Sequence, residues 1–235
     1  MSLSVNPVCR LVVLAKEPRP GKVKTRLCPP FSPDQAAALA AAALSDTFTA
    51  VRGAVTEAAR HDMVVEPVLV LDGSSGEWLD EAWGNDEPPP VVPQREGGLD
   101  ERIAGAFEEA SVAGQPTILI GMDTPQVGAE RLLRAMQELL RPGCDAVFGR
   151  AFDGGWWSLG MAEADPDLVR GIPTSTSFTG RRQLNRLVRA GLRVSLLDSL
   201  RDVDTVADAD EAAALIPSGR FAATLAQCRP RVASA

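Results

Sequence analysis

The acidic composition of this 235-residue chain argues against a general role in binding nucleic acids or membrane surfaces, because Asp and Glu outnumber Lys and Arg by 31 to 24. Four cysteines without a C-x-x-C spacing and one histidine, His61, give poor support to a zinc site, a haem or a Ser–His or Cys–His nucleophile pair. No apolar run approaches the roughly 18 residues of a membrane span, so we expect a cytoplasmic protein with free thiols.

Short apolar segments alternate with helical patterns along the chain, which predicts an α/β fold: a three-layer sandwich with a mainly parallel mixed sheet. No linker is long enough to divide it, so we expect one domain over residues 1–235, with a C-terminal tail at 217–235 that ends in a mobile segment. The predicted strands are 11–15, 65–71, 91–92, 117–121, 145–149, 155–161 and 194–197. The predicted helices are 33–59, a short one containing Trp78 and Trp83, 99–113, 129–140, 181–190 and 208–216.

A basic loop follows the first predicted strand. Loops at the carboxyl end of the first strand of an α/β sheet commonly bind phosphate groups. We therefore expect an anionic ligand here, although a solvated basic loop is the alternative. The loop has one acid, Glu17, and five cations: Lys16, Arg19, Lys22, Lys24 and Arg26.

Side-chain charge has to supply this phosphate binding, because two familiar backbone motifs are missing. A Walker loop would need glycine in place of Lys16 and Ser or Thr in place of Val23, and no G-x-G-x-x-G follows the strand. If the segment is extended, Lys24 and Arg26 project to the same side, where the two cations can bracket a triphosphate.

Acidic residues follow two of the later strands. Asp123 comes directly after the 117–121 strand, at the same crevice as the basic loop, and a carboxylate beside a polyphosphate is repulsive unless a cation such as Mg²⁺ bridges them. The alternative is that Asp123 caps the following helix. Asp202 and Asp204 form a second pair, of which we expect one to be an N-cap and the other to reach a shared metal. Position alone does not choose between them.

Two glycine pairs have ambiguous roles. Gly154 and Gly155, after Asp153, allow close approach of a ligand, but a tight β-turn explains them equally well. Gly97 and Gly98 precede a predicted helix, a place that suits recognition of a base or sugar by backbone groups.

Four motifs in a fixed order carry a family resemblance. They resemble a bacterial family of GT-A-type proteins labelled radical-SAM- or selenodomain-associated glycosyltransferases. They are also similar to phospholactate guanylyltransferases and, more distantly, to the nucleotidyltransferases of molybdopterin and isoprenoid pathways. The motifs are Ala15-Lys16-x-Pro18-x-Pro20-Gly21-x-Val23-Lys24-Thr25-Arg26-Leu27, Gly121-x-Asp123-x-Pro125, Asp153-Gly154-Gly155 and Asp202-Val203-Asp204-Thr205.

The resemblance implies a Rossmann-like GT-A domain of the nucleotide-diphospho-sugar transferase type that uses Mg²⁺ or Mn²⁺. It implies catalytic roles for Lys24, Arg26 and Asp123, with Asp123 and Asp204 as metal ligands. The expected nucleotide contacts are Ala15, Lys16, Gly21, Lys24, Arg26, Gly97, Gly98 and Arg102. The expected acceptor contacts are Asp153, Gly154, Gly155, Ser175 and Thr176.

The chain departs from the family pattern on the acceptor side. We expect Tyr-Tyr after Asp-Gly-Gly and find Trp156-Trp157, and we expect Trp-Ser-Thr where Thr174-Ser175-Thr176 stands. These changes leave the acceptor, the nucleotide base and the oligomeric state open, with a homodimer as one option.

We predict a Mg²⁺-dependent transferase that passes a nucleotidyl group from a nucleoside triphosphate to a small phosphorylated acceptor. An anionic phosphate needs no general base, which agrees with the shortage of histidine. Glycosyl transfer from a nucleotide-sugar is the close alternative, and a non-catalytic nucleotide-binding protein is a further one. In each case the partners are small molecules rather than nucleic acid or membrane.

Overall fold

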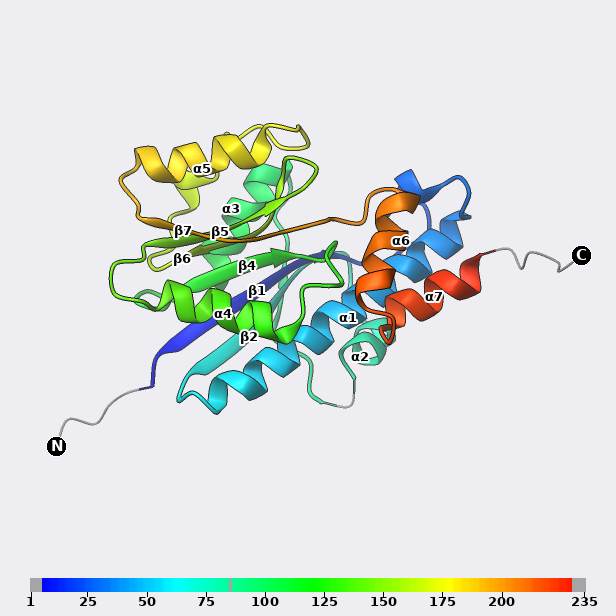
Figure 1. Cartoon of the computed structure of the whole chain (residues 1–235), viewed down its shortest axis with the longest axis horizontal. Helices are drawn as coiled ribbons and strands as arrows, with labels where there is room; N and C mark the ends of the chain where they lie inside the picture. The colour runs from blue at the N-terminus through cyan, green and yellow to red at the C-terminus, as the bar shows by residue number, and fades with distance from the viewer. Residues whose placement is uncertain (1–5, 85, 230–235) are drawn as a thin grey trace, which may run out of the picture.

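A mixed sheet of seven strands forms the centre of the computed structural model, which describes residues 6–84 and 86–229 (Figure 1). The strands are β1 (Val8–Lys16), β2 (Val64–Asp72), β3 (Val91–Pro93), β4 (Thr117–Gly121), β5 (Ala146–Ala151), β6 (Trp156–Met161) and β7 (Val194–Leu200). Their order is β3-β2-β1-β4-β6-β5-β7, with β6 antiparallel to both neighbours and the other pairs parallel. The predicted α/β class and mainly parallel mixed sheet are confirmed.

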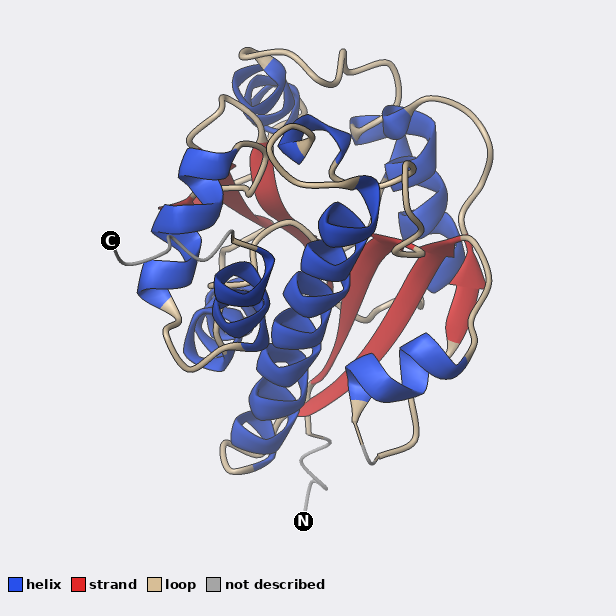
Figure 2. Cartoon of the chain, turned by 90° about the vertical axis from the view of Figure 1, so that its right-hand side faces the viewer, coloured by secondary structure: helices blue, strands red, loops and turns tan. Residues whose placement is uncertain are grey.

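Helices cover both faces of the sheet. On one face lie α1 (Pro33–Ala59), α2 (Glu77–Trp83) and α4 (Ala129–Leu139), and on the other lie α3 (Leu99–Ala110) and α5 (Thr179–Arg189). Figure 2 shows the long α1 running along the sheet. It starts with a capping box, the pattern of a Ser followed three residues later by Gln: the Ser32 hydroxyl accepts from the Gln35 N–H at 3.2 Å, and the Gln35 side chain accepts from the Ser32 N–H at 2.8 Å. None of the described helices is long and apolar enough to cross a membrane.

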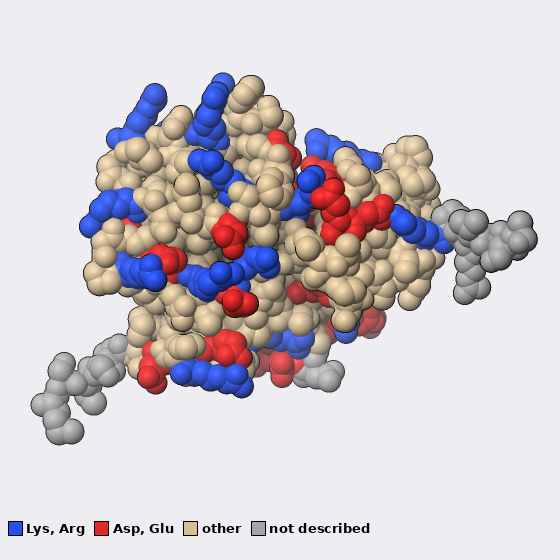
Figure 3. All heavy atoms as spheres, in the orientation of Figure 1, with Lys and Arg blue, Asp and Glu red and all other residues tan. Residues whose placement is uncertain are grey.

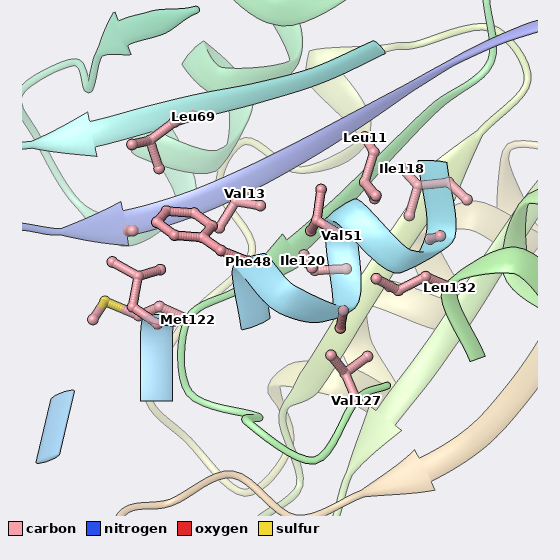
Figure 4. Close-up of a cluster of buried hydrophobic side chains, with 14 of the residues drawn as sticks. Leu11, Val13, Phe48, Val51, Leu69, Ile118, Ile120, Met122, Val127 and Leu132 are labelled. Atoms are coloured by element: carbon pink, nitrogen blue, oxygen red, sulfur yellow. The ribbon is translucent and has the colours of Figure 1, made fainter. Parts of the chain in front are cut away.

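The main core lies between β1 and α1. Alternate residues of a strand point to opposite faces, so Leu11 and Val13 pack toward α1, whereas Val12 packs toward α3. Phe48 and Val51 of α1, both fully buried, meet the first of these faces (Figure 4). This packing fixes the carboxyl end of β1, where the basic loop begins.

A separate, smaller core supports that loop. It joins a 3₁₀ helix, η1 (Thr25–Leu27), to the amino-terminal half of α1 and to two C-terminal helices, α6 (Val206–Leu215) and α7 (Arg220–Cys228). Leu27 and Val203 are fully buried in it together with Phe221 of α7. Asp46 of α1 accepts hydrogen bonds from the first N–H groups of α7, at 2.9 and 2.8 Å, and so holds this helix in place.

Several local predictions need correction. Residues 25–27 are not extended, because Lys24 adopts a left-handed backbone (φ 48°) and the Leu27 N–H donates to the Lys24 carbonyl at 2.9 Å. Helix α3 ends at Ala110, where the Ser111 backbone turns extended, three residues before the predicted end. Helices α5 and α6 each begin two residues earlier than predicted. The C-terminal tail contains a helix, α7, and the mobile segment expected at its end falls on residues 230–235, which lie outside the described residues.

We expect Phe221→Ala to lower the free energy of unfolding by about 3–5 kcal/mol, because the ring is 1% exposed and its removal leaves a cavity. Leu215→Ala, at a side chain that is 68% exposed, should change it by less than about 0.5 kcal/mol. Urea unfolding of both variants measures the difference. Equal losses of unfolding free energy in the two variants would show that the burial of Phe221 in the smaller core does not stabilise the protein.

Candidate functional site

A cleft of about 730 Å³ lies at the carboxyl ends of β1 and β4. Segments far apart in the sequence meet in it, as expected for the binding crevice of a parallel α/β sheet. Its lining comes from β1 and the basic loop, the segment after β4, the β5–β6 turn, the loop before α5 and the segment before α6.

Lys24 ties three of these segments together. Its side chain is only 6% exposed, and its Nζ lies 2.5 Å from Asp123 Oδ1. The same ammonium group donates to the Val203 carbonyl, and the Val203 N–H donates to the Asp123 carbonyl at 2.9 Å. A buried ammonium needs such partners, because burying it without them is costly. Lys24 therefore fixes the loops after β1, β4 and β7 relative to one another.

Asp202 presents a carboxylate to the same place without a protein partner. Its Oδ1 atom is buried and makes no hydrogen bond within residues 6–84 and 86–229. Burial raises the pKa of this carboxyl group from 3.8 to about 8, helped by the negative charges of Asp123 and Asp153 and opposed by Lys24. A buried oxygen without a partner beside other carboxylates is a place where a cation would be stabilised.

Asp204 has a different environment. It forms an exposed ion pair with Arg26 at 2.8 Å. Neither Asp202 nor Asp204 caps α6, contrary to the sequence-based expectation, because Thr205 is the N-cap and forms a capping box with Asp208. Asp208 also pairs with Arg201 at 3.1 Å. Figure 3 shows acidic and basic side chains side by side over the region of α6.

The capping interpretation of Asp123 is also wrong. Helix α4 begins at Ala129 with Gly128 as its N-cap, so the Asp123 carboxylate is free to face the cleft. No group of three or more His, Cys, Asp or Glu side chains in the described ranges stands close enough to hold a metal by itself. Two carboxylates nevertheless fit Mg²⁺ or Mn²⁺, because Mg²⁺ typically takes one or two carboxylates together with substrate phosphates and water. The unpartnered Oδ1 favours Asp202 over Asp204 as the companion of Asp123.

The predicted nucleotide contacts divide into two groups. Ala15, Lys16, Lys24 and Arg26 line the cleft, whereas Gly21, Gly97, Gly98 and Arg102 do not. Arg102 instead donates to Asp72 at 2.5 Å and to the Gly97 carbonyl at 3.1 Å, so it stabilises the loop that contains Gly97 and Gly98 without lining the cleft.

The predicted acceptor contacts lie together on the opposite wall. Asp153, Gly155, Ser175 and Thr176 line the cleft, and Gly154 holds their two segments together. Gly154 has φ 92°, and a Cβ atom there would stand 2.1 Å from the Ser177 carbonyl oxygen, so only glycine fits. The β-turn interpretation also holds, because Asp153 accepts from the Gly155 N–H at 2.7 Å.

Sequence reasoning left several cleft residues out of the predicted site. Lys22 was part of the basic loop but was not selected, and Asp202 was weighed and set aside. Trp156 was noted only as a departure from the family pattern. Thr174 was likewise noted only as a departure from that pattern. Other lining residues, which belong to none of the quoted motifs, include Gln94, Leu99, Ile103, Ser177 and Thr179.

Comparison with known proteins identifies a family for this chain. The family model described as "Uncharacterized protein conserved in bacteria (DUF2064)" matches residues 38–176. None of the curated proteins with which the chain was compared matches it.

Solved structures share the fold. A protein from Desulfovibrio desulfuricans G20, proposed to be a nucleotide-diphospho-sugar transferase, is 26% identical with a TM-score of 0.70, covering 93% of this chain and 97% of that one. A nucleotidyl transferase from Methanothermobacter is 16% identical, with a TM-score of 0.56 and coverage of 90% and 99%. A 4-diphosphocytidyl-2C-methyl-D-erythritol synthase from Anaerococcus prevotii is 9% identical, with a TM-score of 0.57 and coverage of 89% and 96%. At these low identities, the last two show the fold alone.

We expect Asp202→Asn to raise the melting temperature above pH 4, because the folded protein must protonate this buried carboxyl group and Asn avoids that cost. A carboxyl group whose pKa is raised on folding is favourable below its unfolded pKa and loses that contribution as pH rises to its folded pKa. The advantage of the variant should therefore grow between pH 4 and about 8 and then level off. Melting curves across this range measure it.

Asp204→Asn is the matched control, because Asp204 is exposed and paired with Arg26. It should show no such gain. If both variants melt with the same pH dependence as the parent protein, the carboxylate of Asp202 is not desolvated as described.

Proposed function

The chain belongs to the DUF2064 family, and from its polyphosphate-sized cleft with paired carboxylates we propose that it is a metal-dependent transferase that uses a nucleoside triphosphate. The nucleotidyl group is the part transferred, and a small molecule in the same cleft is the acceptor. The observation that carries this proposal is the unpartnered Asp202 oxygen beside Asp123, at the carboxyl edge of the sheet and facing the basic loop.

The charges of the cleft support binding of a metal–nucleotide complex. Cationic and acidic side chains nearly balance along the lining, and several of the cations already have protein partners. A triphosphate alone would meet repulsion from Asp123 and Asp202, whereas a divalent ion between carboxylates and phosphates removes it. The cationic lining residues are Lys16, Lys22, Lys24 and Arg26, and the acidic ones are Asp123, Asp153, Asp202, Asp204 and Asp208.

The residues of the basic loop have separate tasks in this proposal. Lys24 is too buried to follow a moving phosphate, so it positions Asp123. Lys22 and Arg26 contact the phosphates instead, as charge-assisted donors. Asp123 and Asp202 would hold Mg²⁺ or Mn²⁺, which when bound supplies neutralisation of the phosphate charge and polarisation of the transferred group.

Nucleotidyl transfer then requires an acceptor oxygen in line with the bond between the α- and β-phosphates. A new bond forms between this oxygen and the α-phosphorus, and pyrophosphate leaves with the electrons of the broken bond. The extra negative charge on the leaving pyrophosphate is stabilised by Lys22 and Arg26. Positioning and charge stabilisation are the main contributions that a protein makes to such a transfer.

Glycosyl transfer from a nucleotide-sugar is the second candidate. It is favoured by the similarity to the D. desulfuricans protein, which extends over 93% of this chain at 26% identity. The two reactions release different products, namely pyrophosphate or a nucleoside diphosphate.

We expect a panel of nucleoside triphosphates with Mg²⁺ and a mixture of small acceptors to release pyrophosphate. A parallel panel of nucleotide-sugars, tested with the same acceptors, should release no nucleoside diphosphate. Asp123→Asn should abolish turnover, because it removes a metal-binding charge while keeping the side-chain shape. Release of nucleoside diphosphate alone would establish the glycosyl alternative, and binding of nucleotides without any product from either panel would indicate a non-catalytic protein.

Lys22→Ala should weaken binding of the Mg²⁺–nucleotide complex by roughly tenfold, since a hydrogen bond to a charged group contributes about 1.5–3 kcal/mol. Arg19→Ala is the matched control in the same loop. Arg19 pairs with Glu17 at 3.2 Å and does not line the cleft, so its removal should leave affinity unchanged. Titration calorimetry of both variants measures these affinities. Equal affinities of the two variants for the nucleotide complex would show that Lys22 does not contact the phosphates.

A further inference from the structure

The two walls of the cleft differ in charge. Every Lys and Arg among its lining residues comes from the segment 16–26. The opposite wall, formed by the β5–β6 turn and the loop before α5, contributes no cation to the lining, and Asp153 is its only charged residue. The cationic wall accounts for the donor nucleotide, so the other wall faces the second substrate.

The opposite wall is rich in hydroxyl groups and carries an aromatic ring. The hydroxyls of Ser175 and Ser177 make no hydrogen bond to any described residue, and both residues are exposed. Trp156 is half-buried at the cleft and packs against Phe148, with the ring centroids 6.2 Å apart and the ring planes at 50° to each other. Its neighbour Trp157 points to the other side of the sheet, where its Nε1 donates to the Asp198 carbonyl at 3.0 Å.

This wall is held rigidly. The Gly180 N–H donates to the Gly154 carbonyl at 2.8 Å, and the Thr179 hydroxyl donates to the Pro173 carbonyl at 2.9 Å. Within the loop, Ser175 adopts a left-handed backbone with φ 57°, an uncommon conformation for a residue other than glycine. The hydroxyls, the ring and the carboxylate are therefore presented in a fixed arrangement.

A phosphorylated acceptor does not suit this wall. A phosphate monoester carries close to two negative charges at neutral pH, and here it would face Asp153 with no cation from the same wall. Asp202 adds a further acidic group nearby, since the negative charge of Asp153 contributes to the raised pKa of Asp202. An uncharged polyhydroxylated molecule suits it better, because carboxylate and hydroxyl oxygens bind hydroxyl groups and an aromatic face packs against the C–H face of a ring.

We propose that the acceptor is an uncharged polyhydroxylated molecule, a sugar or a cyclic polyol, whose ring packs on Trp156 and whose hydroxyls bind Ser175, Ser177 and Asp153. This rests on the transferase function above and replaces the phosphorylated acceptor expected from sequence. An acceptor hydroxyl oxygen bonds to the α-phosphorus, pyrophosphate leaves with the electron pair, and the hydroxyl proton passes to the free Oδ2 atom of Asp153.

Matched pairs of probes test this acceptor class directly. Glucose with glucose 6-phosphate, and myo-inositol with inositol 1-phosphate, differ only by the phosphate group. Saturation-transfer NMR with the full-length protein and a Mg²⁺–nucleotide should show stronger binding of the uncharged member of each pair, by tenfold or more. Stronger binding of the phosphorylated members, equal binding, or no binding of either uncharged probe would overturn the proposal.

Two variants show whether the named residues are responsible. Trp156→Ala should lose binding of the uncharged probes, whereas Trp78→Ala, in α2 and outside the cleft lining, should retain it. Asp153→Asn keeps an oxygen for the Gly155 N–H but removes the charge, so the preference over the phosphorylated probe should fall about tenfold. An unchanged preference would mean that Asp153 serves only the turn.

Calorimetry with the Mg²⁺–nucleotide separates failure of this inference from failure of the proposed function. If the nucleotide binds but only phosphorylated probes join it, the acceptor assignment is wrong and the transferase proposal remains. If no nucleotide binds, the transferase proposal itself fails.

Discussion

The site depends on one ion pair whose cation is buried, since the Lys24 side chain is 6% exposed and that of Asp123 is 46% exposed. Lys24 is enclosed between the Asp123 carboxylate and the Val203 carbonyl, and these partners come from segments about 100 and 180 residues away. Breaking one partner of a buried pair leaves an uncompensated charge, which costs more than the pair itself contributes. The loops after β1, β4 and β7 therefore keep one relative position. They hold the Asp202 carboxylate where its Oδ1 atom has no hydrogen-bond partner among the described residues and Lys24 offsets only part of the negative charge.

The position of the Asp202 carboxyl group lowers the stability of the folded protein. A carboxylate that is desolvated beside other carboxylates makes the folded state less stable at neutral pH, so packing alone does not explain why it stands there. A bound cation would remove that cost, and its binding would then stabilise the folded protein. Lys24 offsets only part of the charge, because the cleft lining holds more acids than cations. The unfavourable electrostatics of the cleft and the proposed affinity for a metal–nucleotide complex have the same origin.

The periodic elements could be predicted from sequence because each follows from local rules. The capping box at Ser32 and the apolar run of β4 need no tertiary information. The conformation of Lys24 could not be predicted, because its left-handed backbone is stabilised by partners that are distant in sequence. The environments of Asp202 and Asp204 could not be predicted for a similar reason: Arg26, which lies far away in the sequence, pairs with Asp204, and Thr205 rather than either aspartate caps α6. Asp123, which lies at the end of a strongly apolar strand, was placed at the cleft correctly from its position alone.

The family match and the site cover different parts of the chain. Residues 38–176 contain most of the sheet, Asp123 and the β5–β6 turn with Asp153, but neither Lys24 nor Asp202. Those two residues are held by the smaller core, in which η1 and Val203 pack against α6 and α7. The matched segment therefore supplies the scaffold and one carboxylate, whereas the cation that fixes Asp123 and the unpartnered second carboxylate come from the flanks. Any chemistry that needs both carboxylates consequently depends on α6 and α7, which pack against the segments that carry Lys24 and Asp202.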